Sequence, residues 1–233
     1  MRARLMRRTR GDVAEVYDEI AEGYVHWRAR AWPIVKLVRG RKISDLGSGP
    51  CTNGAEVVGR GSAEYAICLD ISLRMLEMGL RKYGGKLLID FIAGDIRFLP
   101  FRSKSLDSIL LIAVLHHISP KDIGKVLGEV ARVVHELGLI LITTWSPWQA
   151  RFLIHLIRNY LMKLVYPRIF PREVLVPWRK KGVTYFRTYY LYTLTELKNL
   201  VAKYVKPRVL LSSMYSRSRK AKSSQNNLII AIK

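Results

Sequence analysis

Residues 42–49 read Lys-Ile-Ser-Asp-Leu-Gly-Ser-Gly, a short apolar strand that runs into a turn with two glycines. Such a strand delivers the chain to the carboxyl edge of a parallel sheet, where ligands bind in open α/β folds. Gly47 and Gly49 let the backbone turn sharply and approach a ligand closely, because neither carries a Cβ. The segment therefore predicts an α/β protein that binds a nucleoside cofactor at this edge.

The spacing of the glycines distinguishes between kinds of cofactor. A dinucleotide site has a third glycine where this chain has Thr52, and a pyrophosphate-binding loop needs a Gly-Lys-Ser/Thr triplet that does not follow here. The pattern Asp-x-Gly-x-Gly that begins at Asp45 resembles motif I of the class I S-adenosylmethionine methyltransferases. That family often has a further glycine where this chain has Cys51. The resemblance implies S-adenosyl-L-methionine as the cofactor, bound by a variant turn.

Two further acidic residues end later predicted strands. Asp70 follows the apolar stretch 65–69 and is expected to hydrogen-bond the ribose hydroxyls, with Ile71 beside it. Asp95 and Ile96 come after the next strand, where this fold places the adenine. A single aspartate at a strand end is common for local reasons. Three of them in order, at regular strand–helix intervals, predict one cofactor-binding edge.

Strands and helices alternate along most of the chain. Apolar patterns predict strands at 42–46, 65–70, 87–92, 106–114 and 138–145, and helices at 12–27, 53–59, 72–82, 120–135 and 196–204. We therefore expect an α/β, doubly wound, Rossmann-like sheet of seven strands, mostly parallel. Its antiparallel terminal strand comes from the pair near 209–215 and 227–232. The chain of 233 residues is expected to form one domain (1–233), with an N-terminal helical cap at 1–39.

The net charge is the second informative property. Forty basic residues face 18 acidic ones, which gives +22. This imbalance favours a polyanionic partner, RNA first and an anionic membrane second. One basic cluster, Arg217, Arg219, Lys220 and Lys222, falls in the loop between the last two strands, either as a mobile hairpin tip or as a phosphate contact.

The cysteines and the apolar runs indicate in which cellular compartment the protein is expected. Cys51 and Cys68 are expected to be a loop residue and a core residue, not a disulfide, which fits a reducing, cytoplasmic location. No apolar run is long enough and free enough of charge for a transmembrane span. The Arg-rich residues 1–10 lack the apolar stretch of a secretory signal.

Residues 147–192 interrupt the alternation as a basic and aromatic insert on the substrate side. Two apolar rows at helical spacing, one from Trp148 to Leu164 and one from Leu153 to Val165, predict an amphipathic helix. Packing on the core is the first interpretation of this helix; covering an RNA cleft or touching a membrane are the others. Between Arg151 and Arg187 the sequence has nine Lys or Arg and a single acid, Glu173. An RNA-backbone surface needs this mixture.

Several segments together resemble one group, the tRNA methyltransferases that esterify 5-carboxymethyluridine at the wobble position, including the methyltransferase domain fused to an AlkB-type hydroxylase. The similar segments are 16–21 (VYDEIA), 28–33 (RARAWP), 112–117 (IAVLHH), 176–178 (VPW) and 187–192 (RTYYLY). Ala29 and Ala31 depart from that family's pattern, and 148–170 has no clear counterpart in it.

The resemblance assigns roles to residues. Cofactor contacts are implied for Asp45, Gly47, Gly49, Asp70, Ile71, Asp95, Ile96 and Tyr24. Substrate contacts are implied for Arg28, Arg30, Trp32, Trp178 and Tyr189. The arginines would act by charge, and Trp32 and either Tyr189 or Tyr190 would stack on an unpaired base. His116, His117 and Arg28 are the candidate catalytic residues; one histidine is expected to position the acceptor and the other to pack in the core.

A partner and two other functions remain as hypotheses. An exposed apolar edge strand is a liability, and the resemblance implies a small activator protein that pairs with 87–92. A lipid or quinone methyltransferase that uses 148–165 as a membrane-facing lid is one alternative function. A catalytically silent RNA-binding module is the other, although Asp45, Asp70 and Asp95 argue against it.

Overall fold

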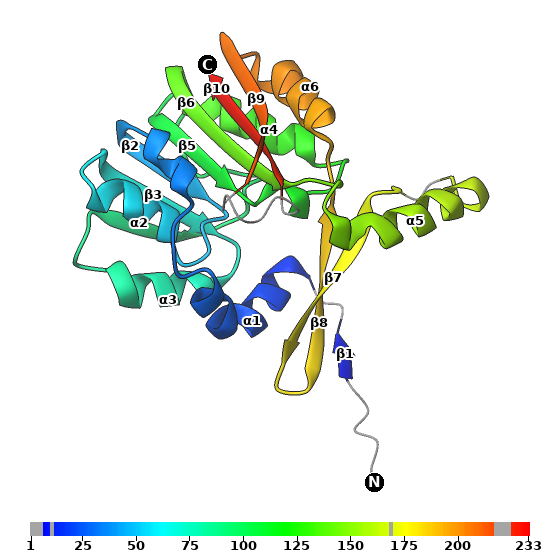
Figure 1. Cartoon of the computed structure of the whole chain (residues 1–233). Coiled ribbons are helices and arrows are strands. Elements are labelled where there is room, and N and C mark those ends of the chain that lie inside the picture. Colours follow the sequence, from blue (N-terminus) through cyan, green and yellow to red (C-terminus); the bar gives the residue numbers. More distant parts are fainter. Residues whose placement is uncertain (1–6, 10–11, 168–169, 217–224) are drawn as a thin grey trace.

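A computed structural model describes residues 7–9, 12–167, 170–216 and 225–233. Its main sheet has seven strands in the order β4-β3-β2-β5-β6-β10-β9 (Figure 1). Their bounds are β2 Gly40–Leu46, β3 Ala63–Asp70, β4 Ile89–Ala93, β5 Leu106–Ile112, β6 Val134–Trp145, β9 Val209–Tyr215 and β10 Asn226–Ile232. β10 is antiparallel to both neighbours and the other pairs are parallel. The predicted doubly wound, mostly parallel sheet is confirmed.

Helices cover both faces of this sheet. α4 (Ile123–Val133) and α6 (Leu194–Val205) bury their apolar sides in one core cluster, against Leu106, Ile140 and other inward residues of the strands. On the opposite face a 3₁₀ helix, η1 (Pro33–Leu37), packs with Val57 of α2 (Thr52–Gly59) in a second cluster. Apolar burial on both faces fixes the strand register, because a one-residue slip would turn each side chain to the other face.

The N-terminal helix α1 (Val13–Trp27) lies beside α3 (Leu73–Tyr83), below the carboxyl ends of the strands (Figure 1). A capping box begins α1: the Asp12 side chain caps the first turn and Glu15 returns a bond to the Asp12 amide. The face of α1 that carries Val16 and Ile20 is buried. The helix predicted at 12–27 is therefore present as α1. It lies at the edge of the sheet where the sequence predicts the cofactor.

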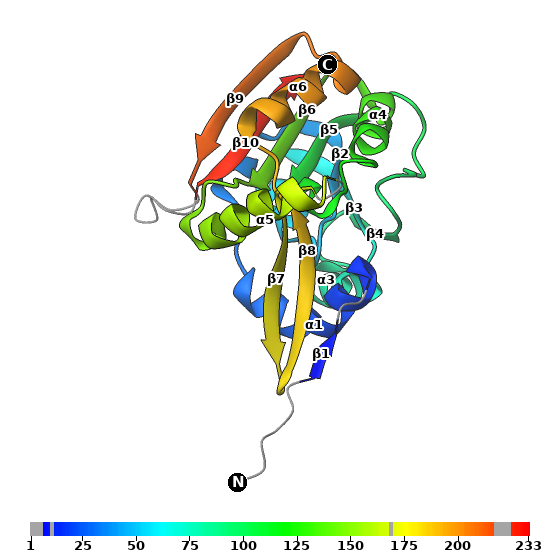
Figure 2. The same cartoon turned by 90° about the vertical axis from the view of Figure 1, so that its right-hand side faces the viewer.

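A second, small sheet stands away from the first. Its three strands are β1 (Arg7–Thr9), β8 (Val183–Tyr190) and β7 (Glu173–Lys180), with β7 and β8 forming an antiparallel hairpin. Figures 1 and 2 show this hairpin extending down past α1. The hairpin lies within the insert, for which the sequence predicted composition but no strands.

The insert helix α5 (Leu153–Val165) follows the short η3 (Ala150–Phe152) and projects from the body (Figure 1). The expectation that it packs on the core is wrong for most of its apolar residues. Leu156 is 5% exposed, whereas Ile154, Leu161 and Leu164 are 80%, 61% and 81% exposed. Only one side of α5 reaches Trp145 and the β7–β8 hairpin. Within the described residues, none of the helices combines the length and apolarity needed to cross a membrane.

A disulfide joins Cys51 to Cys68, with their Cα atoms 5.7 Å apart. The expectation of two unpaired cysteines is therefore wrong. Asp45 and Cys68 are partners in the β2–β3 ladder, so the turn that leaves β2 returns Cys51 to the end of β3. Cysteine usage consequently gives no support to a reducing compartment. The basic cluster at 217–222 lies outside the described residues.

Candidate functional site

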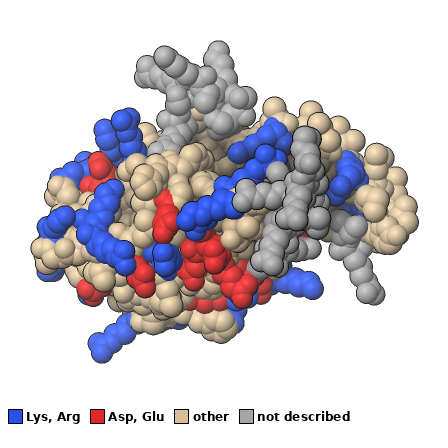
Figure 3. Space-filling model, turned by 90° about the horizontal axis from the view of Figure 1, so that it is seen from below, with Lys and Arg blue, Asp and Glu red and all other residues tan. Residues whose placement is uncertain are grey.

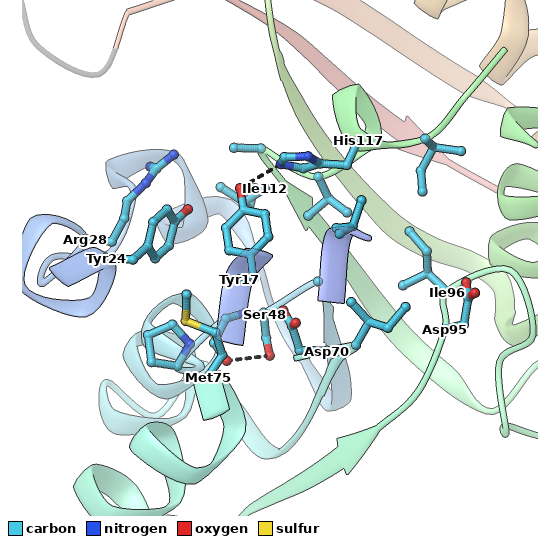
Figure 4. Close-up of a pocket in the computed structure, with 18 of the residues that line it drawn as sticks. Tyr17, Tyr24, Arg28, Ser48, Asp70, Met75, Asp95, Ile96, Ile112 and His117 are labelled. Atoms are coloured by element: carbon cyan, nitrogen blue, oxygen red, sulfur yellow. Dashed lines mark hydrogen bonds between the residues drawn. The ribbon is translucent and has the colours of Figure 1, made fainter. Parts of the chain in front are cut away.

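A cavity of about 390 Å³ opens at the carboxyl ends of the parallel strands (Figure 4). Its walls come from the β2–α2 turn, the ends of β3 and β5, the loop after β4, and α1. Among the residues predicted from the sequence, the cavity is lined by Tyr24, Arg28, Arg30, Trp32, Gly47, Gly49, Asp70, Ile71, Asp95, Ile96 and His117. The fold therefore brings most of the predicted site residues to one place.

The glycine turn forms the floor of the cavity. Gly47 and Gly49 have φ angles of 64° and 55°, which favour glycine. A Cβ on Gly47 would lie 2.7 Å from the Val114 side chain. Both the backbone conformation and the close approach of Val114 thus require glycine at position 47.

Asp70 connects this turn to the next helix. Its carboxylate accepts hydrogen bonds from the amides of Gly49 (2.7 Å) and Ser72 (2.9 Å). Burial raises its pKa above the usual value, against the effect of those amide bonds. Ser72 caps the start of α3 and also donates to Asp18 of α1. The carboxylate is held by backbone groups at the cavity wall, where a ribose hydroxyl needs an acceptor.

Asp95 and Ile96 form the far wall of the cavity (Figure 4). Arg97 holds Asp95 in place by a bond from its amide (2.8 Å) and by an ion pair at 2.6 Å. Burial alone would raise the pKa of Asp95, but the bonds from Arg97 outweigh it and lower the pKa. Ile96 is 7% exposed and lines the cavity, so an apolar side chain lies next to an ionised acceptor. An adenine ring needs both.

Asp45 lies behind the turn and does not line the cavity. Its carboxylate is 1% exposed and accepts a hydrogen bond from the Gly54 amide at 3.0 Å. Burial raises its pKa to about 7. The structure therefore gives Asp45 a part in fixing the start of α2, and no direct contact with the cavity.

The opposite end of the cavity is formed by aromatic and basic side chains of α1 and by His117. The Tyr17 hydroxyl lies 2.9 Å from Nε2 of His117, which belongs to the short η2 (Leu115–His117) at the end of β5. Figure 4 shows Tyr17, Tyr24 and Arg28 on the same side as His117. Burial, together with the charge of Arg187, lowers the pKa of His117 to about 3. His117 is consequently a neutral hydrogen-bonding group at neutral pH.

His116 and Tyr189 lie behind this end of the cavity. They are 1% and 2% exposed, and their ring centroids are 4.5 Å apart. Burial moves the pKa of His116 well below its usual value. One histidine of the pair thus faces the cavity and the other packs in the core, as expected. Trp145 and the two histidines enclose the ring of Tyr189, which does not favour base stacking on it, whereas Tyr190, the alternative stacking residue, lines the cavity.

Two arginines lie near this end without an acidic partner: Arg28 lines the cavity, whereas Arg187 does not line it but acts electrostatically on Tyr17 and His117. Arg187 is 7% exposed, with its guanidinium against Trp178 and Tyr189. Arg28 lies between Trp27 and Trp32, 4.8 and 4.9 Å from their ring centroids. Among the described residues neither forms an ion pair, and the buried Nε atom of each lacks a hydrogen-bond partner. Buried positive charge with open donors is suited to an anionic group.

The remaining predicted residues occupy different places. Trp32 lines the cavity but is 5% exposed and stacks with Tyr215, so its ring is part of the core. Arg30 lines the cavity from the loop after α1. Trp178 does not line it; this side chain packs between Tyr24 and Arg187.

Arg187 and Tyr17 have site positions that sequence reasoning missed. Arg187 is two residues from Tyr189, so the two side chains share one face of β8. The segment Arg-Thr-Tyr-Tyr contains this alternation of side chains, but the sequence pattern predicts no strand there. Tyr17 lies two helical turns before Tyr24, on the same face of α1.

Comparisons with known proteins agree with this geometry. Residues 44–142 match the family described as methyltransferase domain. The demethylmenaquinone methyltransferase of Clavibacter sepedonicus is 30% identical over 63% of this chain and 62% of its own. The tRNA (carboxymethyluridine(34)-5-O)-methyltransferase of Arabidopsis thaliana is 34% identical over 59% of this chain and 33% of its own. The chain thus spans less than two thirds of the length of these curated relatives.

Solved structures show the same fold. A methyltransferase from Methanosarcina mazei, described as S-adenosylmethionine-dependent, superposes with a TM-score of 0.68 at 19% identity, over 88% of this chain and 98% of its own. A putative methyltransferase complexed with the Haloferax volcanii Trm112 activator has a TM-score of 0.64 at 15% identity, over 94% of this chain and 96% of its own. The fold is that of the class I methyltransferases.

Proposed function

We propose that this chain transfers the methyl group of S-adenosylmethionine to a carboxylate, that of 5-carboxymethyluridine at the wobble position of tRNA. The observation that carries this proposal is a pair of arginines without acidic partners, Arg28 in the cavity lining and Arg187 buried next to that lining. A quinone ring would favour an apolar wall at this place. Two guanidinium groups with open donors favour an acidic acceptor, and bidentate pairing with a carboxylate also orients it.

The chemistry of a carboxylate acceptor agrees with the protonation state of the site. A carboxylic acid with a pKa near 4 is ionised at neutral pH. Bound S-adenosylmethionine supplies a methyl group made electrophilic by its sulfonium. The acceptor oxygen forms a bond to the methyl carbon as the carbon–sulfur bond breaks, so no proton moves. His117, whose pKa is about 3, is a poor general base and serves as an orienting group.

The cofactor end has the acceptors that such a ligand requires. Asp70 is aimed at the ribose, while Asp95 and Ile96 offer an edge contact and a face contact to the adenine. Gly47 keeps the turn tight against Val114, because a Cβ at this position would clash with that side chain. The enzyme would then accelerate methyl transfer by aligning the acceptor oxygen with the methyl carbon and the sulfur and by excluding water.

The charge of the chain and one relative favour RNA as the carrier of the carboxylate. The net charge is +22. Figure 3 shows basic side chains spread around a smaller group of acidic ones on the face seen from below. A surface of this sign attracts a phosphate backbone. The Arabidopsis relative, 34% identical, is a methyltransferase for carboxymethyluridine at position 34 of tRNA.

The test is methyl transfer to tRNA that carries the unesterified nucleoside. The chain is incubated with bulk tRNA and cofactor labelled in its methyl group, and the tRNA is digested to nucleosides. We expect label in an ester of carboxymethyluridine that mild alkali releases. Label on a ring carbon or on the ribose contradicts the carboxylate acceptor. Absence of S-adenosylmethionine binding in a titration would favour a silent RNA-binding module.

A quinone or lipid acceptor is the second candidate. It is favoured by the several demethylmenaquinone methyltransferases among the relatives, such as those of Clavibacter sepedonicus and Renibacterium salmoninarum at 30% identity. The exposed apolar residues of α5 also agree with it. Parallel reactions with demethylmenaquinone in detergent and with tRNA distinguish the two acceptors. Both reactions contain the same amount of methyl-labelled cofactor, and the label that enters each acceptor is measured.

A small activator protein is the proposed partner. β4 is an edge strand of the main sheet, as predicted, and Leu88 beside it is 68% exposed. An added strand from a partner would complete the backbone hydrogen bonds of this edge. One fold neighbour is itself complexed with such an activator. If co-expression with an activator changes neither the melting temperature nor the activity, and the isolated chain is a soluble monomer, the partner proposal is wrong.

A further inference from the structure

The most prominent surface that the proposed function does not use is the outer side of α5. One side of the helix is anchored: Leu156 is buried against Trp145 and Tyr189, and Asn159 donates to the Glu173 carbonyl at 2.6 Å. The opposite side carries six aliphatic residues at helical spacing, here called the outer apolar face: Leu153, Ile154, Ile157, Leu161, Leu164 and Val165. Their exposed fractions lie between 54% and 81%. An apolar stripe of this kind on a soluble surface marks an interaction site.

The charges around this face indicate what covers it. Residues 148–167 contain Arg151, Arg158 and Lys163 and no acidic residue. An aliphatic face bordered only by positive charge complements a surface that is apolar inside and negative at its boundary. Trp148 and Tyr166 flank the helix and are 73% and 55% exposed. Tryptophan and tyrosine are enriched where hydrocarbon meets water.

We propose that α5 is an interfacial helix that lies flat on an anionic lipid membrane and inserts its outer apolar face between the headgroups. The helix has 13 residues, and no described helix is long and apolar enough to span a bilayer. A short, basic, amphipathic helix instead binds in the plane of the interface. This inference goes beyond the proposed function, because it does not depend on which acceptor is methylated.

Other occupants fit the face less well. Aliphatic side chains neither stack on bases nor pair with phosphates, so RNA would leave the outer apolar face exposed. A second copy of α5 would bring like charges together, with Arg158 and Lys163 of both helices near the contact. The helix α5 follows β6, which is separated from the β4 edge by β3, β2 and β5, so an activator that pairs with β4 would bind away from α5.

The test is flotation of the full chain, freed of RNA by nuclease, with vesicles of phosphatidylglycerol or of phosphatidylcholine. We expect the chain to float with the anionic vesicles and to remain below with the neutral ones. The variant Ile154→Ser/Ile157→Ser/Leu161→Ser is expected to lose more than tenfold in partition, and Arg158→Gln/Lys163→Gln about fivefold per charge removed. Val209→Ser/Leu211→Ser, which removes exposed apolar side chains (46% and 59%) from β9, is the matched control and should float like the wild type.

Several results would overturn the proposal. The first is failure of the wild-type chain to float with anionic vesicles. The second is a triple serine variant that floats like the wild type, because this result would show that net charge alone attracts the chain to the vesicles. Failure to float together with a dimer that the triple variant breaks would assign the face to a second copy. Failure to float together with RNA affinity that falls only in the triple variant would assign it to RNA. Circular dichroism melting curves establish that each variant is folded.

Discussion

The hydroxyl of Tyr17 lies 2.9 Å from Nε2 of His117, although 100 residues separate them in sequence. The contact joins α1 to the end of β5, and so links the N-terminal cap to the strand end beside the cofactor turn. Burial raises the pKa of Tyr17 well above its usual value, so the hydroxyl keeps its proton. The pair therefore forms a neutral, fixed wall at the acceptor end of the cavity.

Replacing Tyr17 by phenylalanine should loosen this wall without removing the ring. A neutral hydrogen bond contributes about 1 kcal/mol, so we expect kcat/KM for the acceptor to fall about fivefold. The dissociation constant for S-adenosylmethionine, measured by calorimetry, should stay within about twofold of the wild type. Tyr65→Phe is the matched control, because Tyr65 bonds Asp90 at the distant edge of the sheet. An equal loss of cofactor affinity in Tyr17→Phe would show that Tyr17 acts on the cofactor.

Arg187 should determine whether the acceptor needs a carboxylate. A charge-assisted hydrogen bond contributes about 1.5–3 kcal/mol. We therefore expect Arg187→Gln to raise KM for a carboxymethyluridine anticodon stem-loop by about 10- to 100-fold. The more specific readout is competition by the stem-loop with unmodified uridine. The wild type should discriminate against it, and Arg187→Gln should lose that preference.

A matched control for Arg187 is Arg179→Gln, which removes an exposed charge from the same hairpin. Its effect on KM should be small and should disappear at high salt, as for a phosphate contact. If Arg179→Gln and Arg187→Gln weaken binding of both stem-loops equally, Arg187 contributes general RNA affinity and recognises no carboxylate.

Asp70→Asn tests the cofactor end of the cavity. The two oxygens of Asp70 accept from the amides of Gly49 and Ser72, and an asparagine retains one acceptor only. We expect the dissociation constant for S-adenosylmethionine to rise at least tenfold and the free energy of unfolding to fall by about 1–3 kcal/mol. Glu56→Gln, an exposed change on α2, serves as the control. Unchanged cofactor affinity in a folded Asp70→Asn protein would contradict the assignment.

The main sheet could be predicted from the sequence because its signals are local. Each strand is a short apolar run between turns, and the acids at 45, 70 and 95 fall at strand ends. The β7–β8 hairpin was missed because it lies outside the core. On β8, Thr188 and Tyr190 line the cavity, whereas Arg187 and Tyr189 are buried on the other face of the strand. Polar side chains therefore occupy both faces and hide the apolar period of a strand.

The candidate site could be predicted as a set of residues but not as a geometry. The sequence could not tell that Tyr189 is enclosed by Trp145 and the histidines, or that Asp45 lies behind the turn. Both facts depend on packing between segments far apart in the chain. The disulfide was missed for the same reason: a separation of 17 residues says nothing until the register of β2 and β3 brings Cys51 to Cys68.

The disulfide should stabilise the fold and hold the cofactor turn against β3. Closing a loop of this length in the unfolded chain contributes about 3 kcal/mol. We expect Cys51→Ala/Cys68→Ala, or reduction of the wild type, to lower the free energy of unfolding by about 2–4 kcal/mol. Denaturant titration with and without reductant measures it. Reductant should not change the double variant, and denatured wild type should react with a thiol-alkylating reagent only after reduction. Alkylation beforehand would contradict the bond.

Asp45 should make stability fall as the pH rises from about 4 to 7. Its pKa is near 3.8 in the unfolded chain and about 7 in the folded one, where burial disfavours the charge. Between these values the folded state holds a proton that the unfolded state has lost, so the free energy of unfolding decreases with pH and levels off above 7. The variant Asp45→Asn keeps an acceptor for Gly54 and removes this titration. Across about three pH units, at about 1.4 kcal/mol each, its stability relative to the wild type should rise by up to about 4 kcal/mol.

His117 acts in the opposite direction, because its lowered pKa makes stability increase with pH between about 3 and 6.5, but it is present in both proteins and cancels in the difference. Denaturant titrations of both proteins at a series of pH values measure that difference, and a constant difference from pH 4 to 8 would contradict the buried, protonated state of Asp45.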